Sequence, residues 1–443
     1  MKKLLVTIAA LTLIVTGCGN SNVSSDSTPA QGSSENAPAA ATPADPAAGD
    51  LSGSEIHIMA RAGQYYNILS EISSQFTEQT GIRVNVQEVG RDGFLQKVST
   101  QLLGGSNSVD AVVTINNYVG QFAAGGQFEN LDPFIEKYGD NMDRFLPIAQ
   151  EAVTYNGSVY AMPVNVGTMF LIYRSDLIQT PPATWDEYLQ VAKQFTKSAT
   201  PDSVTEFGAT FQGKRGETLP KEWYQLLWSM GGEIFDEDMK PLLDSEASIK
   251  AVNYVYDLYK TDKVLAPDTT TYDFPECLSA FQNEKVAMSI LWNSGIPQLK
   301  NEETSPLVYD KYAIAPVPGV SFNHSWTIAM NSASKSKDAA YQYMAWLTGE
   351  EGAKQYALAG DIPPVKAVLE DAEVLAKYPE YEMIIDTLGK AKGEPNIPEW
   401  PVIHEMIAES LSKVLADEKK ADEAMTELNQ RIEDTMQKAG YYK

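Results

Sequence analysis

The stretch from Tyr155 to Asp176, which reads YNGSVYAMPVNVGTMFLIYRSD, constrains the fold more than any other part of the chain. It opens with Asn156-Gly157, a pair that suits a tight turn because both residues tolerate positive φ. Two runs rich in branched and aromatic residues follow, and Pro163 and Gly167 would weaken the interior of one long strand. We interpret the stretch as a crossing between two lobes; a kinked edge strand is the alternative. The residues placed at the cleft between the lobes are Asn165, Gly167 and Thr168.

Strands and helices alternate before this stretch. Strands are predicted at 55–60, 82–89 and 109–115, and helices at 68–76 and 93–103. This order implies parallel pairing and an α/β lobe.

A second α/β lobe is expected after the crossing. It would contain strands at 207–211 and 286–291 and helices at 221–232, 248–260 and 276–285. The chain would then cross back near Pro316, form a strand at 326–331, cross a third time near 365–380, and end in two helices from about Val402 and about Ala421.

Polar loops follow two of the early strands, at 61–66 (RAGQYY) and at 116–118 (NNY). Ligands of open α/β sheets bind beyond the carboxyl ends of the strands. The candidate binding residues in these loops are Arg61, Tyr65, Asn116 and Asn117. An arginine at such a place can pair with two hydroxyl groups or with a carboxylate, although ordinary solvated loops would look the same.

The segment PPATWDE at 181–187 supplies a helix start, because Thr184 is a good N-cap and Glu187 completes a capping box. Together with 155–176, it resembles the first crossover of the extracytoplasmic solute-binding proteins of sugar ABC transporters, the family that includes the maltose-binding protein. The resemblance covers nearly all of the chain after residue 54.

The resemblance implies an α/β, two-lobe periplasmic-binding-protein fold of type II, in which each lobe is a mixed sheet flanked by helices and hinge crossovers join the lobes. It also implies a receptor that delivers its ligand to the permease of an ABC importer powered by a cytoplasmic ATPase. The expected parts are a first lobe at 55–161, a second lobe at 162–315, a return to the first lobe at 316–375, and C-terminal helices at 376–443, mostly in the second lobe.

The N-terminus has the pattern of a bacterial lipoprotein signal. Lys2 and Lys3 precede an apolar run, and VTGC at 15–18 matches a lipobox. We expect a signal peptide at 1–17, lipid on Cys18, and a flexible linker through residue 53, because that segment is too poor in apolar side chains to order itself. The protein would be held on the extracytoplasmic face of a bacterial cell membrane. Cys277 would then have no cysteine partner in its own chain.

Charge and composition limit the partners. The formal net charge of −25 argues against nucleic acid and against adhesion to anionic lipid, and disfavours anionic ligands without excluding them. Self-repulsion suits a monomeric receptor. The three histidines show no metal-ligand spacing, and no catalytic or nucleotide-binding motif appears, so we expect neither an enzyme nor a cofactor. The alternatives are a glycoside hydrolase and a receptor for iron, another metal ion or a peptide.

A sugar or polyol site needs an aromatic surface under the C–H face of the ligand and polar side chains around its edge. We place four tryptophans at element ends near the cleft, while noting that each could belong to the core. The candidates from the later chain are Glu222, Trp223, Trp292, Asn293, Trp326, Asp361 and Trp400. The expected ligand is a mono- or oligosaccharide or a polyol.

Overall fold

The computed structural model describes residues 50–91 and 93–442. The expected signal peptide at 1–17, the expected lipidation site Cys18 and most of the expected linker lie outside these residues. From residue 50 onward the chain belongs to one structural unit, in which two hydrophobic cores define a first and a second lobe. Among the described helices, none is long and apolar enough to cross a membrane.

The first lobe is built on a mixed sheet with the order β2-β1-β3-β9-β6. Strand β1 (Glu55–Arg61) pairs in parallel with β2 (Arg83–Val89) and β3 (Ala111–Ile115). Strand β9 (Asn323–Met330) is antiparallel to β3 and brings a distant part of the sequence into the middle of the sheet. The parallel pairing that strand-helix alternation predicts is therefore present.

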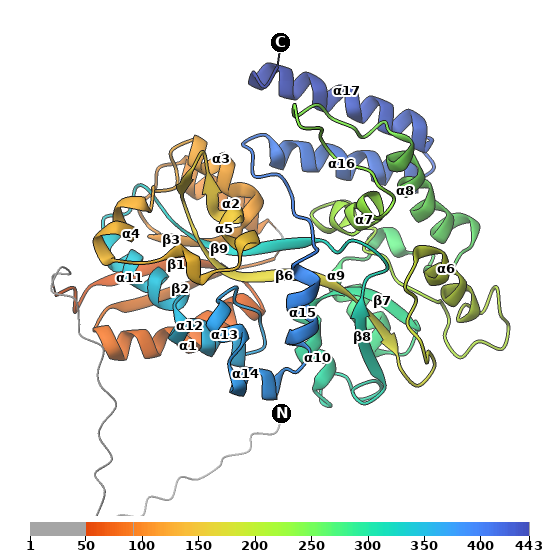
Figure 1. Ribbon diagram of the computed structural model, residues 1–443, viewed down its shortest axis with the longest axis horizontal. Helices are drawn as coiled ribbons and strands as arrows, with labels where there is room; N and C mark the ends of the chain where they lie inside the picture. The colour runs from red at the N-terminus through yellow and green to blue at the C-terminus, as the bar shows by residue number, and fades with distance from the viewer. Residues whose placement is uncertain (1–49, 92, 443) are drawn as a thin grey trace, which may run out of the picture. The chain divides into compact units, whose positions relative to one another are not determined.

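Strand β6 (Met162–Arg174) joins the lobes. Its first half pairs with β9, and its second half pairs with β7 (Met288–Trp292) and β8 (Tyr312–Pro316) of the second lobe. In Figure 1 it runs from one lobe to the other. Pro163 and Gly167 do not break the strand: the register shifts at Pro163, and a Cβ at Gly167 would lie 2.7 Å from the His324 ring. The glycine therefore permits close approach of β6 and β9.

A short hairpin before β6 contains the turn that the sequence predicts. The hairpin of β4 (Thr154–Tyr155) and β5 (Ser158–Val159) is closed by Asn156 and Gly157, which have φ angles of 48° and 81°. The predicted tight turn is confirmed.

Helices pack around the first-lobe core (Figure 1). Helix α1 (Gln64–Thr80) ends at Gly81, which takes the left-handed conformation that stops a helix without a Cβ clash. The other helices here are α2 (Phe94–Leu103), α3 (Val119–Ala124), α4 (Asp132–Tyr138), α5 (Pro147–Val153), α11 (Lys337–Leu347), α12 (Glu350–Leu358), α13 (Lys366–Leu369), α14 (Ala372–Lys377) and α15 (Tyr381–Leu388).

The second lobe is mainly helical outside β7 and β8. Helix α6 (Trp185–Gln194) starts as predicted: Thr184 Oγ1 accepts a hydrogen bond from Glu187 N at 3.2 Å. The Glu187 carboxylate accepts from the amide of Ala183 rather than from that of Thr184. The remaining helices are α7 (Thr218–Ser229), α8 (Glu246–Tyr256), α9 (Phe274–Gln282), α10 (Ile296–Lys300), α16 (Trp400–Leu415) and α17 (Ala421–Ala439).

Two expectations about chain path need correction. Residues 207–211 form no strand, and the backbone there makes only an isolated bridge from Phe207 to Val286. The chain also stays in the first lobe longer than expected, because Val365, Tyr381 and Leu388 pack in the first core. Trp400 packs in the second core, so the third crossing follows Leu388 and does not lie at 365–380.

Candidate functional site

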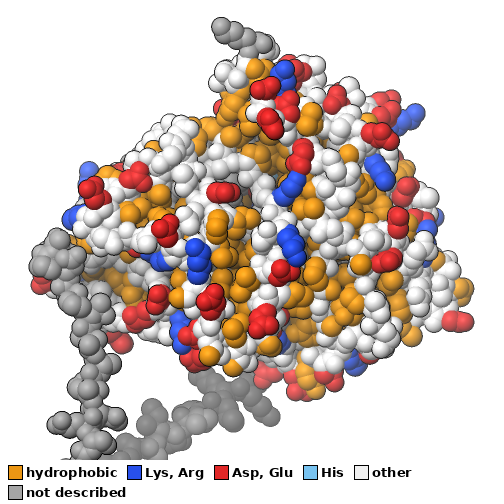
Figure 2. Space-filling model, viewed as in Figure 1, with side chains coloured by type: hydrophobic (Ala, Val, Ile, Leu, Met, Phe, Trp, Pro, Cys, Tyr) orange, Lys and Arg blue, Asp and Glu red, His pale blue; other side chains and the backbone are white. Residues whose placement is uncertain are grey.

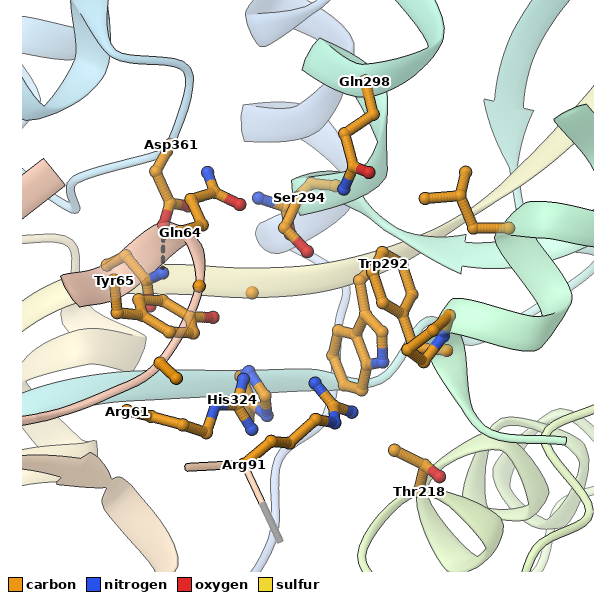
Figure 3. A pocket seen from close by; sticks show the side chains of 18 of the residues that line it. Arg61, Gln64, Tyr65, Arg91, Thr218, Trp292, Ser294, Gln298, His324 and Asp361 are labelled. Atoms are coloured by element: carbon orange, nitrogen blue, oxygen red, sulfur yellow. Dashed lines mark hydrogen bonds between the residues drawn. The ribbon is translucent and has the colours of Figure 1, made fainter. Parts of the chain in front are cut away.

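A cavity of about 340 Å³ lies between the two lobes. Figure 3 shows side chains from both lobes around it. The volume is at the small end of the range for ligand pockets. Its lining residues come from the ends of β1 and β2, the β6 crossing, the start of α7, the start of α9, the segment after β7, and the loop before α13.

An aromatic and cationic stack forms the first-lobe wall. The rings of Tyr65 and Trp326 stack with centroids 4.3 Å apart, and the guanidinium carbon of Arg61 lies 4.3 Å from the Trp326 ring centroid. Trp326 is 1% exposed, so its partners cover the ring. The indole orients Arg61 by a cation–π contact instead of offering a face to a ligand.

Asn165 and Asp361 connect the strand crossing to the loop before α13. Asn165 Nδ2 donates to Asp361 Oδ2 at 2.7 Å, and Asn165 Oδ1 accepts from Trp326 N at 3.0 Å. Burial raises the pKa of Asp361 to about 6, although the hydrogen bond from Asn165 opposes that shift. Asp361 therefore remains mainly ionised at neutral pH, with part of its hydrogen-bonding capacity already used.

Trp292 forms an aromatic part of the second-lobe wall. It is 7% exposed and stacks on His324 with ring centroids 4.4 Å apart. Burial, with the charge of Lys221 as the second cause, lowers the pKa of His324 well below its ordinary value. The imidazole is thus neutral and packs as a flat ring. Asn293 is fixed beside Trp292 because its Oδ1 accepts from Thr168 N at 2.9 Å.

An ion pair between the buried Lys221 and the partly exposed Glu217 lies at the start of α7. Lys221 Nζ is 2.9 Å from Glu217 Oε1, and Lys221 Nζ lies 3.4 Å from His324 Nδ1. Burial opposes ionisation of Glu217, but the charges of Lys221 and Arg61 hold its pKa far below the usual range. The cation closest to Glu217 is Lys221.

A close ion pair between Arg91 and Asp273 bridges the lobes beside the cavity. Arg91 Nη2 of the first lobe lies 3.0 Å from Asp273 Oδ2 of the second. Asp273 also caps α9, because its Oδ1 accepts from Phe274 N at 2.8 Å, and the same oxygen accepts from Thr218 Oγ1 at 2.9 Å. The Asp273 carboxylate therefore has two roles: it pairs with the opposite lobe beside the cavity, and it caps the start of α9.

The structure brings together seven of the fourteen residues that the sequence placed at the cleft. The candidates that line the cavity are Arg61, Tyr65, Asn165, Gly167, Trp292, Asn293 and Asp361. Trp326 lines an adjoining hollow behind Arg61.

The other six candidates lie elsewhere. Thr168 is fully buried, and its Oγ1 donates to Phe322 O at 2.9 Å. Trp223 and Trp400 are fully buried in the second core, because α7 and α16 turn their apolar faces inward. Glu222 is buried as well and accepts from Gln212 N at 2.8 Å.

The two asparagines after β3 bond to other parts of the chain instead of lining the cavity: Asn116 to the backbone and Asn117 to a side chain. Asn116 Oδ1 accepts from Ser325 N at 2.9 Å, and Asn117 Nδ2 donates to Glu394 at 3.2 Å. Asn116 lines a separate hollow that also includes Asn323 and Glu394.

Several lining residues were not predicted. Arg91 could have been found, because it follows β2, the parallel neighbour of β1, at the same sheet edge. No comparable sequence signal marks His324, which enters through an antiparallel strand from far along the chain. The further polar lining residues are Gln64, Glu217, Thr218, Gln282, Ser294 and Gln298.

The arrangement is that of a binding site. It offers aromatic side chains, several amide and hydroxyl groups, and charges of both signs. Among the described residues, no three His, Cys, Asp or Glu side chains are grouped so as to hold a metal ion.

Comparison with known proteins agrees with this geometry. A probable amino-acid ABC transporter periplasmic-binding protein of Sinorhizobium fredii is 26% identical over 415 residues, which cover 88% of this chain and 91% of that protein. A maltotriose-binding protein of Pyrococcus abyssi is 25% identical over 330 residues, or 71% of this chain and 67% of that protein.

Solved structures share the fold. Maltose-bound MalE3 of T. maritima superposes with a TM-score of 0.80 at 23% identity, covering 86% of this chain and all of that one. A ribitol-bound solute-binding protein of Agrobacterium radiobacter gives 0.79 at 24% identity, covering 87% and 100%. These are two-lobed proteins of the type II periplasmic-binding-protein fold, which is the fold of this chain.

The sequence also matches the family of bacterial extracellular solute-binding proteins over residues 62–354, most of the chain. That family consists of receptors that act outside the cytoplasm. This protein belongs to the bacterial extracellular solute-binding proteins, and it is a receptor rather than an enzyme.

Proposed function

We propose that the protein is the receptor of an ABC importer and that it binds a carbohydrate or polyol in the cavity between its lobes. The observation that carries this proposal is Trp292, an indole at the cavity wall with Asn293 and Ser294 next to it. An aromatic surface beside amide and hydroxyl groups matches a molecule that has C–H faces and hydroxyl edges.

Ligand binding is coupled to lobe closure. Lining side chains come from both lobes, so only the closed arrangement contacts the ligand on all sides. A ligand stabilises the state in which it makes most contacts. The lobes rotate about the crossings, of which β6 is the first. The closed form then presents itself to a membrane permease.

The N-terminal part serves retention at the membrane. After residues 1–17 are cleaved off, a lipid on Cys18 would anchor the protein in the cell membrane. The linker through residue 53 would then hold a monomeric receptor at the outer face of that membrane. The division into lobes at 55–161, 162–315, 316–375 and 376–443 belongs to the same proposal, with the third crossing moved to follow Leu388.

Amino acids are the alternative ligand class that the comparisons suggest. The Sinorhizobium relative is named for amino acids, whereas structural neighbours are bound to maltose, ribitol and D-mannitol. The small cavity with Trp292 favours a short sugar or a polyol. An amino acid, which is a zwitterion, would also find side chains of both charge signs in this cavity.

A thermal-shift screen distinguishes the two classes. The purified full chain is heated with mono-, di- and oligosaccharides, polyols, amino acids and metal ions, because a ligand that binds only the folded state raises the melting temperature. We expect a shift with one group of sugars or polyols. A shift with amino acids or metal ions alone would overturn the proposed ligand class.

A further inference from the structure

Two guanidinium groups lie together on one edge of the cavity of this acidic protein. The chain has a net charge of −25, and acidic side chains are spread over the face shown in Figure 2. In Figure 3, however, Arg61 and Arg91 lie along one edge, while Asp361, Gln64 and Ser294 lie along the opposite edge. An adjoining hollow of about 280 Å³ shares Arg61 and Arg91. The two guanidinium groups are therefore gathered on one edge of the cavity, which also holds the Glu217 carboxylate.

Arg61 lacks a close anionic partner. Its nearest carboxylate oxygen is Glu217 Oε2, at 3.9 Å from Nη1, and its buried Nε has no hydrogen-bond partner among the described residues. The Arg61 side chain is 12% exposed. A guanidinium that is largely removed from water without a matched acceptor is costly, and an incoming anion removes that cost.

The carboxylates near Arg61 have other partners. Glu217 is 1 Å closer to Lys221 than to Arg61, at 2.9 Å against 3.9 Å. Asp273 pairs with Arg91 and caps α9. Neither is positioned to satisfy the planar fork of Arg61, which binds a carboxylate best through two parallel hydrogen bonds.

The causes of the pKa shift of Arg61 are consistent with a guanidinium group that still lacks a matched anionic acceptor. Burial lowers the pKa of Arg61; Tyr65 and Glu217 oppose that shift, and the charge of Arg91 adds to it. The two guanidinium groups thus repel each other across this edge. The stacking of Arg61 on Trp326 at 4.3 Å keeps the group in place despite that repulsion.

We propose that the ligand is an acidic saccharide or sugar acid, whose carboxylate binds Arg61 beside Arg91 while its hydroxyl groups face Asn165, Asp361 and Ser294. This inference rests on the proposed function and narrows it. The ring or carbon chain of the ligand lies against Trp292. Asp361 accepts hydrogen bonds from hydroxyl groups at the far end, where a second carboxylate would be repelled.

The test uses matched ligand pairs and matched variants. Isothermal titration calorimetry on the full chain compares D-glucuronate with D-glucose, D-galacturonate with D-galactose, and D-gluconate with D-glucitol, together with their oligomers and a set of amino acids. The variants are Arg61→Gln and the control Arg83→Gln. Arg83 pairs with Glu55 at 3.0 Å on the surface of the first lobe.

The wild-type protein should bind an acid at least about tenfold more tightly than its neutral partner, the factor expected for one charged hydrogen-bonded contact. Arg61→Gln should abolish this ratio, and Arg83→Gln should keep it. The ratio is measured within each variant, so a general loss of stability does not imitate the effect.

Other results would overturn the inference in distinguishable ways. Equal or tighter binding of the neutral sugar or polyol, or a ratio unchanged by Arg61→Gln, would reject the acidic ligand and leave the proposed function standing. Binding of amino acids alone, or of no member of either sugar series, would reject the proposed function as well.

Discussion

At the residue scale, Glu222 makes the stability of the fold depend on pH. Burial raises its pKa to about 8, although hydrogen bonds from Gln212 oppose the shift. The folded state therefore holds a proton that the unfolded chain releases near pH 4.5. It follows that the contribution of Glu222 to the free energy of unfolding falls as the pH rises from about 4.5 to about 8.

Replacing Glu222 by Gln should remove that dependence. The Glu222→Gln variant should match the wild type in stability near pH 4 and exceed it by on the order of 3 kcal/mol at pH 7. Urea denaturation of both proteins at a series of pH values measures the difference. A difference that stays constant between pH 4 and pH 8 would show that Glu222 is ionised in the folded state.

The tryptophans show which part of a site a sequence can reveal. Trp292 and Trp400 both occur at element ends in the chain, yet only Trp292 lines the cavity. Tertiary packing separates the two tryptophans: the first turn of α16 places Trp400 in the second core, and no local sequence pattern specifies that direction. Arg61 was predictable because it ends a parallel strand, and Asp361 because the family resemblance places its loop near the cleft.

At the element scale, Asp273 links helix α9 to the opposite lobe. Its carboxylate caps α9 within a full capping box and also pairs with Arg91. Asp273→Ala should lower the free energy of unfolding by about 1 to 2 kcal/mol through the lost cap. It should also raise the ligand dissociation rate, because the closed state loses an ion pair between lobes.

The matched control is Ser245→Ala, which removes the cap of α8 within the second lobe. It should lower stability by a similar amount and leave the dissociation rate unchanged. Stopped-flow release of the ligand found in the screen, combined with denaturation curves, separates the two effects. Equal dissociation rates in both variants would mean that the pair with Arg91 does not hold the lobes closed.

Elements also differ in how far sequence predicts them. The alternating strands and the Thr184 cap follow from local pattern and capping chemistry, and they are found in the structure. Residues 207–211 have strand composition but form only an isolated bridge. Likewise, nothing local marks where helices after Val365 leave the first core, so the third crossing was placed too early.

At the scale of the whole molecule, the account depends on a ligand binding between the two lobes in the cavity that Trp292 lines. Trp292 offers the most specific test, since its indole lies at the cavity wall. A control is Trp346, which packs against Phe76 and Tyr343 in the first lobe.

The decisive measurement is isothermal titration of the wild type, Trp292→Ala and Trp346→Ala with the ligand that the thermal-shift screen identifies. The account predicts one ligand per chain, binding weakened by about 1 to 3 kcal/mol in Trp292→Ala, and unchanged affinity in folded Trp346→Ala. Wild-type affinity in Trp292→Ala would contradict the account, because the ligand would then bind somewhere other than this cavity.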